Sequence, residues 1–518
     1  MDYVSRRLKR SDVDAGSIRG MGCHEGYQLA MHTLDQYRGT VVAATYCPPI
    51  SLTGPGSLDT LKAKFTDAVA RVALAQPHLH VGITGEDTAK PNFVRLEALD
   101  LRNHIHWKAL DDAVSRERQY LEELQLQLDS RFDNLATQPG WRVIILHDAG
   151  AESIEVLYVW NHPHHDGMSG KIFHQQLFKI LNDKENFSKP LADKLQDDSG
   201  SLIVKLPESS EKLPPPPEVL TAFPMTPPFL LKKLWKEVKP YSIFPPTSVH
   251  ATWAPVKLQP FTTRFQSFSI DNDTIVKLVA SCRRHQTTVT GLLHALVLLS
   301  LSSGLRDMKG FAARTPYDLR HYLPSHTKEY PWLVPKETIC NYVSVLDHKF
   351  HPDLVAKIRA EFSPDRVAAG EPLPADIMHT IWSVAARVRK EIKDRLESGI
   401  VNDMIGIMKF AGDWRPQQES EARKPRYLSW LVTNLGVLEG GLSKAENERQ
   451  GDDWTIHRAQ LFLSTEIPSA ALSVAVSTIK DGQMDITCSW QDCVVDPDLG
   501  ANLMNNLNRW LAEIGSLA

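Results

Sequence analysis

The sequence predicts an α/β protein made of two halves, each of which mixes helices and strands. The chain has 518 residues, too long for one typical domain, so two or three hydrophobic cores are expected. Hydrophobic residues make up 42% of the chain and charged residues 23%, as is ordinary for a globular protein. A proline-rich stretch separates the halves. We therefore predict a first subdomain at 1–205, a linker at 206–250 and a second subdomain at 251–518.

Regular elements fill the first half. Apolar residues recur at helical spacing from Leu61 to Val72, between a Gly-Pro-Gly turn and Pro77. Two apolar runs bounded by turn residues are typical of strands, and the short connection between them predicts a hairpin. The predicted elements are a helix at 61–72, a more polar helix at 115–128, strands at 141–146 and 154–160, and a helix at 169–181.

Proline dominates the linker. A run at 214–217 and further prolines at 224, 227, 228, 240, 245 and 246 forbid long regular elements. Residues 229–238 nevertheless form a short, basic, amphipathic segment, which could make weak contact with a membrane surface. Because this segment is short and flanked by prolines, we favour a linker helix that packs on a domain or over the mouth of a tunnel.

The second half repeats the mixture of helices and strands. Two alternating segments on either side of Lys480-Asp481-Gly482-Gln483 strongly predict a hairpin. A strongly apolar helix at 290–301 is expected to be buried. The other predictions are a strand at 263–270, a helix at 273–284, a loop at 316–320, strands at 427–438 and 459–464, hairpin strands at 471–479 and 484–490, and a helix at 498–514.

Composition excludes several functions. The net charge of −4 leaves no basic excess to neutralise the phosphates of a nucleic acid. The six cysteines are scattered without a CxxC pair, which favours a reducing compartment over a disulfide scaffold. Residues 1–20 are charged and lack the apolar core of a signal peptide. Without a run of about 18 apolar residues, no membrane-spanning helix is expected. We therefore expect a cytoplasmic enzyme or binding protein.

The most informative stretch is 161–167, Asn-His-Pro-His-His-Asp-Gly, which follows the strand predicted at 154–160. It places His162 at a strand end, and histidine suits a general base because its unperturbed pKa is about 6.5. Asp166 could hold a nitrogen of His162, or it could pair with an arginine and fix the turn. Gly167 is expected to relieve the steric limits on that turn. No nucleophilic serine or cysteine is needed if two bound substrates react directly.

Attack on an activated carbonyl also needs a donor for the oxyanion. Thr433 and Asn434, predicted on a strand-to-loop segment of the second half, are the candidates. The site would then lie between the two halves, where ligand sites often form.

Two other interpretations of this stretch are weaker. The histidines and Asp166, with His147 or His174 nearby, could bind zinc, but His164, His165 and Asp166 are consecutive and cannot all converge on one ion without an unusual turn. The other interpretation is a surface turn whose histidines have no catalytic role. The strand before the motif and the helix after it make this interpretation less favoured. Ser169 lacks the spacing of a nucleophile elbow, and no Walker loop, GxGxxG or HExxH motif occurs.

The stretch resembles the HxxxDG motif of the coenzyme-A-dependent acyltransferase superfamily. That superfamily includes chloramphenicol acetyltransferase, plant BAHD acyltransferases, fungal alcohol acetyltransferases and peptide-synthetase condensation domains. Three further segments resemble the fungal alcohol acetyltransferases in the expected order: 139–142 (Pro-Gly-Trp-Arg), 318–324 with the Asn341 segment at 340–343, and 433–436 (Thr-Asn-Leu-Gly). The BAHD DFGWG loop has no clear counterpart. Asn161 stands where condensation domains carry a second histidine, which favours a coenzyme A thioester over a carrier-protein donor.

The resemblance implies a fold and a site. Two chloramphenicol-acetyltransferase-like subdomains, each a mixed β-sheet with flanking helices, enclose a channel. His162 would lie mid-channel, with acyl-CoA entering from one face and the acceptor from the other. Asp166 would be structural, with Arg320 as its candidate partner; Asn341 and Gly436 belong to the matched segments. Acyl-CoA would be a co-substrate, no permanent cofactor or metal is implied, and the chain is expected to be a monomer.

The predicted function is that of an acyl-CoA-dependent O-acyltransferase, most simply an acetyltransferase acting on a small or medium alcohol of secondary metabolism. His162 would deprotonate the acceptor hydroxyl within a ternary complex. One alternative keeps the fold but changes the reaction to N-acylation, or to carrier-protein-dependent condensation or product release. Another is a binding protein without catalysis, against which the intact His162, Asp166 and Gly167 argue.

Overall fold

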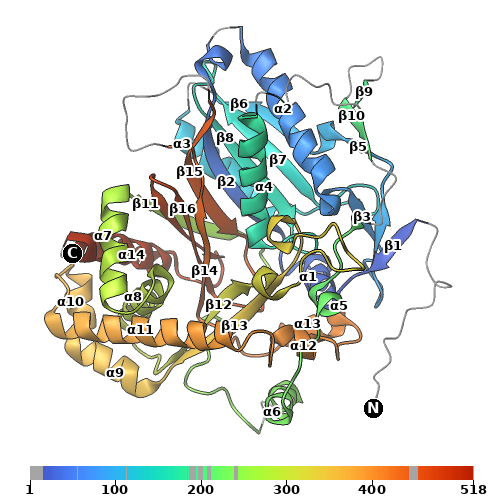
Figure 1. Ribbon diagram of the computed structural model, residues 1–518. Coiled ribbons are helices and arrows are strands. Elements are labelled where there is room, and N and C mark those ends of the chain that lie inside the picture. The colour runs from blue at the N-terminus through green and yellow to red at the C-terminus, as the bar shows by residue number, and fades with distance from the viewer. Residues whose placement is uncertain are drawn as a thin grey trace.

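The computed structural model describes residues 16–54, 56–111, 114–183, 185, 194–196, 202–206, 212–238, 243–442 and 453–516. Two large mixed sheets dominate it, one in the upper and one in the lower part of Figure 1, and helices cover both. This confirms the α/β class with mixed sheets and flanking helices. Among the described residues, no single helix is long and apolar enough to cross a membrane; α7 (Asn272–Arg284) and α8 (Val289–Gly304) pass that test only together, across a 90° bend.

The first sheet has five strands. Only its β6–β7 pair is parallel. The strand order is β15 (Thr455–Leu463), β2 (Gly39–Cys47), β8 (Ile154–Asn161), β7 (Trp141–His147) and β6 (Ile105–Ala109). The predicted hairpin is confirmed, because β7 and β8 pair antiparallel.

Helices pack on both faces of this sheet. Side chains alternate between the faces of a strand, so Val42 packs with α2 (Leu58–Ala75) and α4 (Gly167–Leu181), whereas Val41 packs with α3 (Arg116–Asp129) and α1 (Cys23–Thr33). Figure 1 shows α2 and α4 side by side over one face. Burial on both faces explains why every residue of β8 is buried.

Six strands make up the second sheet. Their order is β11 (Thr263–Ile270), β17 (Met484–Gln491), β16 (Leu472–Ile479), β14 (Trp430–Leu438), β12 (Phe311–Asp318) and β13 (Val343–Phe350). The hairpin predicted around 480–483 is confirmed by the antiparallel β16–β17 pair. The remaining strands form two small sheets, one of β1 (Ser17–Gly20), β4 (Asn92–Arg95) and β3 (Val81–Thr84), the other of β5 (Ala98–Asp100), β10 (Leu202–Lys205) and β9 (Lys194–Gln196).

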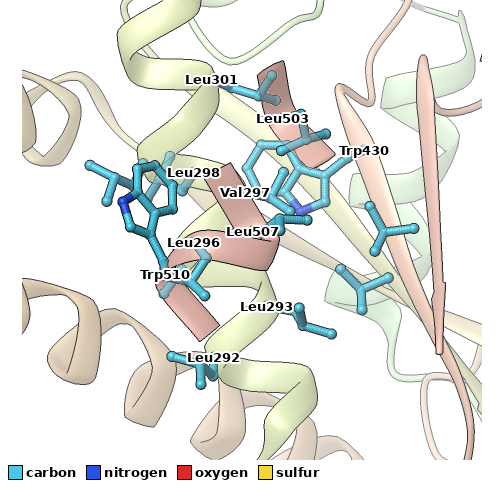
Figure 2. Close-up of a cluster of buried hydrophobic side chains, with 14 of the residues drawn as sticks. Leu292, Leu293, Leu296, Val297, Leu298, Leu301, Trp430, Leu503, Leu507 and Trp510 are labelled. Carbon is cyan, nitrogen blue, oxygen red and sulfur yellow. The ribbon is translucent and has the colours of Figure 1, made fainter. Parts of the chain in front are cut away.

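The core of the second half lies between its sheet and α8, as predicted for this apolar helix. Figure 2 shows leucines of α8 packed against Leu503, Leu507 and Trp510 of α14 (Pro497–Ser516) and against Trp430 of β14. The Trp430 indole donates a hydrogen bond to His294 Nδ1 of α8 at 3.0 Å, so that its polar atom is satisfied inside the core. The other helices are α5 (Pro217–Leu220), α6 (Pro227–Val238), α9 (Pro352–Glu361), α10 (Pro364–Ala368), α11 (Ala375–Glu397), α12 (Met404–Met408) and α13 (Trp414–Glu421).

Two predictions need correction. The range 251–518 does not stay within the second half, because β15 leaves it and pairs with β2 in the first sheet. Hydroxyls of β16 and β17 donate to carbonyls of β15, for example Ser489 Oγ to Leu463 O at 2.7 Å, and so join the two sheets. The loop predicted at 316–320 is instead strand as far as Asp318. β12 pairs with β14 only at Ala313 and Arg314, so its later part lacks one neighbour and tolerates Pro316.

Candidate active site

His162 is the first residue after β8. The strand ends at Asn161, whose backbone N–H donates to Gly140 O at 2.8 Å, and the chain then turns towards α4. A Cβ at Gly140 would lie only 2.9 Å from Asn161 Cβ and from His164 Nδ1, so this close approach requires glycine. The Pro-Gly pair before β7 therefore shapes the turn that carries His162.

Asp166 caps α4 and is turned towards the second half. Its Oδ1 accepts hydrogen bonds from the backbone N–H and the hydroxyl of Ser169, both at 2.9 Å. Its Oδ2 accepts the backbone N–H of Tyr342 at 2.8 Å. Arg320 Nη1 reaches Oδ2 at 2.7 Å and Nη2 reaches Oδ1 at 3.0 Å, in a bidentate pair. Every hydrogen bond recorded for this carboxylate thus goes to Ser169, Tyr342 or Arg320, and His162 is not among its partners.

Arg320 is a buried clamp. Besides Asp166, it donates to Asp318 Oδ1 at 3.0 Å and to Cys340 O at 3.1 Å. Burial alone would raise the pKa of the Asp166 carboxyl, but the charge and hydrogen bonds of Arg320 outweigh it and hold that pKa below its ordinary value. The pair therefore stays ionised and ties the motif to the 338–342 segment, and Arg320 is the partner that the resemblance suggested for Asp166.

Asn341 supports the histidine from the other side. Its amide Nδ2 donates to the backbone carbonyl of His162 at 2.7 Å and lies 3.4 Å from the ring Nδ1. The rings of Tyr37 and His24 flank the imidazole, with centroids 5.7 and 6.2 Å away. These contacts fix the backbone and the ring of His162 at the end of the strand.

The His162 imidazole is held neutral. Burial lowers its pKa below the ordinary value, more than the charge of Asp166 and a hydrogen bond with its own backbone raise it. A neutral imidazole keeps one ring nitrogen with a free lone pair, which can accept a proton.

A cavity of about 590 Å³ opens at His162. Its wall is largely apolar and comes mainly from α12, α13 and the segment around them, including Ile405, Met408 and Trp414. Polar groups interrupt that wall, namely Tyr27, Gln28, Arg314, Asp347, Gln418 and Glu466. The site is thus a base in the wall of a mostly apolar cavity.

The structure separates the two oxyanion candidates. Alternation along β14 puts Thr433 on the same face as Leu431, which lines the cavity, and Leu435, which packs in the first core. Asn434 faces the other way, where its amide donates to Thr290 Oγ1 at 3.2 Å and its Oδ1 accepts from Gly436 N–H at 2.7 Å. Neither residue lines the cavity that contains His162.

Gly436 and Gly167 have different roles from each other. Gly436 has a φ of +72°, a conformation that favours glycine, and lies in the irregularity of β14 between Asn434 and Val437. The predicted reason for Gly167 is wrong, because it begins α4 without a positive φ and a Cβ there would make an ordinary 3.5 Å contact with Leu435.

The other histidines of the motif are packing residues. His164 and His165 are fully buried, and burial lowers the pKa of both, to about 3 for His164. The Trp160 indole donates to His165 O at 3.0 Å. Within the described ranges, no three histidine, cysteine, aspartate or glutamate side chains are grouped to hold a metal ion.

Sequence reasoning missed several residues of the site. His24 and Tyr37 flank His162 from α1 and the loop after it, and Glu466 reaches the cavity from the loop after β15. No motif marks them, because they come from segments far from 161–167. Periodicity could have identified α1 as a helix, but not the face that meets the motif.

Comparisons with known proteins agree with this geometry. Residues 110–332 match the alcohol acetyltransferase family, a range that includes His162, Asp166 and Arg320. A probable alcohol acetyltransferase of Fusarium pseudograminearum is 28% identical over 96% of both chains. The resemblance stated from the sequence is therefore confirmed, as is the expectation of an acetyltransferase.

Solved structures show the same fold. The TRI3 trichothecene 15-O-acetyltransferase from Fusarium sporotrichioides is similar over 95% of this chain and 94% of that one, with a TM-score of 0.64 and 12% identity. The starter condensation domain of rhizomide synthetase, in complex with C8-CoA, is similar over 96% and 94%, with a TM-score of 0.55 and 12% identity. The predicted fold of two chloramphenicol-acetyltransferase-like subdomains is thus confirmed for this chain.

Proposed function

We propose that this acetyltransferase moves an acetyl group from acetyl-CoA to a hydroxyl of a largely apolar acceptor, with His162 as the general base. The observation that carries the proposal is a half-buried, neutral His162 in the wall of a mostly apolar cavity of about 590 Å³. Substrate cavities commonly measure about 300–1,000 Å³, so this one suits an acceptor much larger than a short-chain alcohol. The trichothecene acetylation named for the TRI3 fold neighbour is a reaction of this kind.

The reaction needs no covalent enzyme intermediate. The unprotonated ring nitrogen of His162 takes the proton of the acceptor hydroxyl as the oxygen attacks the thioester carbonyl. The tetrahedral intermediate then collapses, the carbon–sulfur bond breaks, and the imidazolium returns its proton to the departing thiolate. Asp166 and Arg320 do not touch the reacting atoms; they fix the turn and the 338–342 segment that position His162.

Thr433 is the better candidate for the oxyanion donor. It lies on the face of β14 that is turned towards the cavity and the first core, whereas the Asn434 amide is engaged with Thr290. We therefore assign the hydroxyl of Thr433 to the oxyanion and assign Asn434 and Gly436 to shaping the segment.

A direct test follows the thiol and the product. The purified chain is incubated with acetyl-CoA and a panel of apolar alcohols, while coenzyme A release and product mass are measured. Replacement of His162 by Ala should lower kcat about 10²–10⁴-fold, because general base catalysis supplies about that factor. Circular dichroism checks that the variant is folded. Wild-type turnover by a folded His162→Ala variant would contradict the mechanism.

Parallel reactions address the rival activities. Amines in place of alcohols test N-acylation, and an acetylated carrier protein in place of acetyl-CoA tests carrier dependence. A product only with amines, or only with the carrier donor, would replace the proposed reaction by that alternative. Failure to release coenzyme A with any acceptor would favour a binding protein.

A further inference from the structure

Helix α6 turns its apolar face outward. Leu231 is 68% exposed and Trp235 is 54% exposed, and Leu234 is exposed beside them. Residues at i, i+3 and i+4 share one side of a helix, so these three form a continuous stripe. Figure 1 shows α6 at the lower edge of the molecule, apart from both sheets. The sequence-based preference for a linker helix over the mouth of a tunnel agrees with Lys233 and Leu234, which line the cavity, but the stripe itself remains exposed.

The chain after α6 enlarges the stripe. Ile243 is 69% exposed, and the exposed ring of Phe244 meets that of Trp235 edge-on, with centroids 5.3 Å apart. We call Leu231, Leu234, Trp235, Ile243 and Phe244 the docking patch. Single exposed apolar residues are normal on a protein surface, but a contiguous group of this size marks an interaction site.

Basic residues favour one kind of partner. Lys232 and Lys233 project from the side of α6 away from the stripe. Leucine and tryptophan on one side with lysines on the other are typical of helices that lie in the surface of a membrane with anionic lipids.

The docking patch is anchored at the mouth of the cavity. The loop before α12 holds the start of α6, because Thr226 N–H donates to Asn402 Oδ1 and Asn402 N–H donates to Pro224 O, both at 2.8 Å. Lys233 and Leu234 line the cavity, as does Phe410, which is 65% exposed. The patch and the cavity therefore share a rim.

We propose that the docking patch binds an anionic lipid surface and thereby opens the cavity towards the bilayer, from which an apolar acceptor enters. Entry of the acceptor rests on the proposed function, whereas lipid binding does not. A membrane contact of α6 alone would only hold the enzyme at the bilayer. Because the docking patch and the cavity share a rim, the same contact also gives the acceptor a route from the bilayer into the cavity.

Vesicle flotation tests the binding. The full chain is mixed with vesicles of phosphatidylcholine alone or of phosphatidylcholine with phosphatidylserine, at low and high salt. We expect binding to the anionic vesicles, weakened by salt, and a loss of about tenfold or more in the double variant Leu231→Glu/Trp235→Glu, since charges replace the inserted side chains. The control is Leu126→Glu/Val276→Glu, which adds the same charges at exposed apolar positions elsewhere and should bind like wild type.

Three results would overturn the proposal. They are absence of binding to either vesicle, equal binding by both double variants and wild type, and a dimer in light scattering that dissociates only in Leu231→Glu/Trp235→Glu. The last result would assign the patch to a second copy. Thiol release with a water-soluble acceptor and no lipid should be unchanged in Leu231→Glu/Trp235→Glu. Binding to vesicles without any acetyl transfer would contradict the proposed function but would still support lipid binding by the docking patch.

Discussion

Arg320 holds both carboxylate oxygens of Asp166, at 2.7 and 3.0 Å, and the pair joins the HxxxDG turn to the second half of the molecule. The two residues are 154 positions apart in sequence and both are buried. Both oxygens of the carboxylate are occupied by hydrogen bonds to Arg320 and to the first turn of α4, so Asp166 has no direct part in the chemistry of His162. Asp166 is a positioning residue.

The first prediction concerns this ion pair. Asp166→Asn leaves the buried Arg320 charge unpaired and should cost about 3–5 kcal/mol of unfolding free energy. The matched control, Asp492→Asn, removes the partner of Arg264 in an exposed pair and should cost less than about 1 kcal/mol. Urea denaturation measures both. Equal losses in the two variants would show that the buried pair is not the clamp described here.

The second prediction concerns Asn341. Asn341→Ala removes the amide that donates to the His162 carbonyl, so kcat should fall about tenfold, equivalent to about 1.4 kcal/mol, while the acceptor KM stays unchanged. Asn182→Ala is the control, because its amide makes comparable bonds to the backbone carbonyls of Phe178 and Trp454 at the opposite end of α4 from the motif. A raised KM with unaltered kcat in Asn341→Ala would assign this residue to acceptor binding instead.

Local patterns predicted most of the elements but not how they meet. The β7–β8 and β16–β17 hairpins follow from short turns between apolar runs, because neighbours in sequence pair directly. β15 looked like any strand of the second half. Its pairing with β2 depends on long-range contacts that periodicity does not encode.

The site was predictable to the same extent. His162, Asp166 and Arg320 could be identified because they stand in recognisable segments, and the structure then brings Asp166 and Arg320 together. The different orientations of Thr433 and Asn434 could not be predicted, because they depend on which face of β14 meets the helices. The cavity wall from α12 and α13 carries no motif at all.

The third prediction concerns the pH dependence of the reaction. Burial lowers the pKa of His162 below 6.5, and only the neutral ring can accept a proton. The acidic limb of a plot of kcat/KM against pH should therefore lie below pH 6.5, with full activity at neutral pH. The profile is recorded with a non-ionising acceptor at constant ionic strength. A limb centred above pH 6.5 would mean that His162 is more solvated or closer to a negative charge than described.

The fourth prediction concerns the pH dependence of stability. Burial also lowers the pKa of other histidines, for example to about 3 for His24 and His164 and to about 4 for His32 and His174. The unfolded chain then binds more protons than the folded chain below pH 6.5. The contribution of these neutral rings to the free energy of unfolding is complete above pH 6.5. It is lost as the pH falls towards about 4, and each ring then lowers the free energy of unfolding by about 1.4 kcal/mol per pH unit.

One buried acid acts in the opposite direction over part of that range. Burial raises the pKa of Asp485 to about 6, so this carboxyl binds a proton at a higher pH in the folded chain than in the unfolded chain. Between about pH 6 and 4 its proton uptake stabilises the folded chain and offsets the loss from roughly one histidine. Unfolding free energies from urea titrations at pH 7 and pH 5 should therefore still decrease with pH. Equal stability at both pH values would contradict the burial of these rings in neutral form.

The fifth prediction tests which substrate occupies the cavity. Trp414 of α13 lines it, with its ring edge-on to Tyr27 at 5.3 Å, so Trp414→Ala should remove apolar contacts with the acceptor and raise the acceptor KM about tenfold. The KM for acetyl-CoA should not change. Trp332→Ala is the control, because Trp332 is half-buried but lies outside the cavity lining. A raised KM for acetyl-CoA in Trp414→Ala would place the donor, and not the acceptor, in this cavity and reverse the two sides of His162.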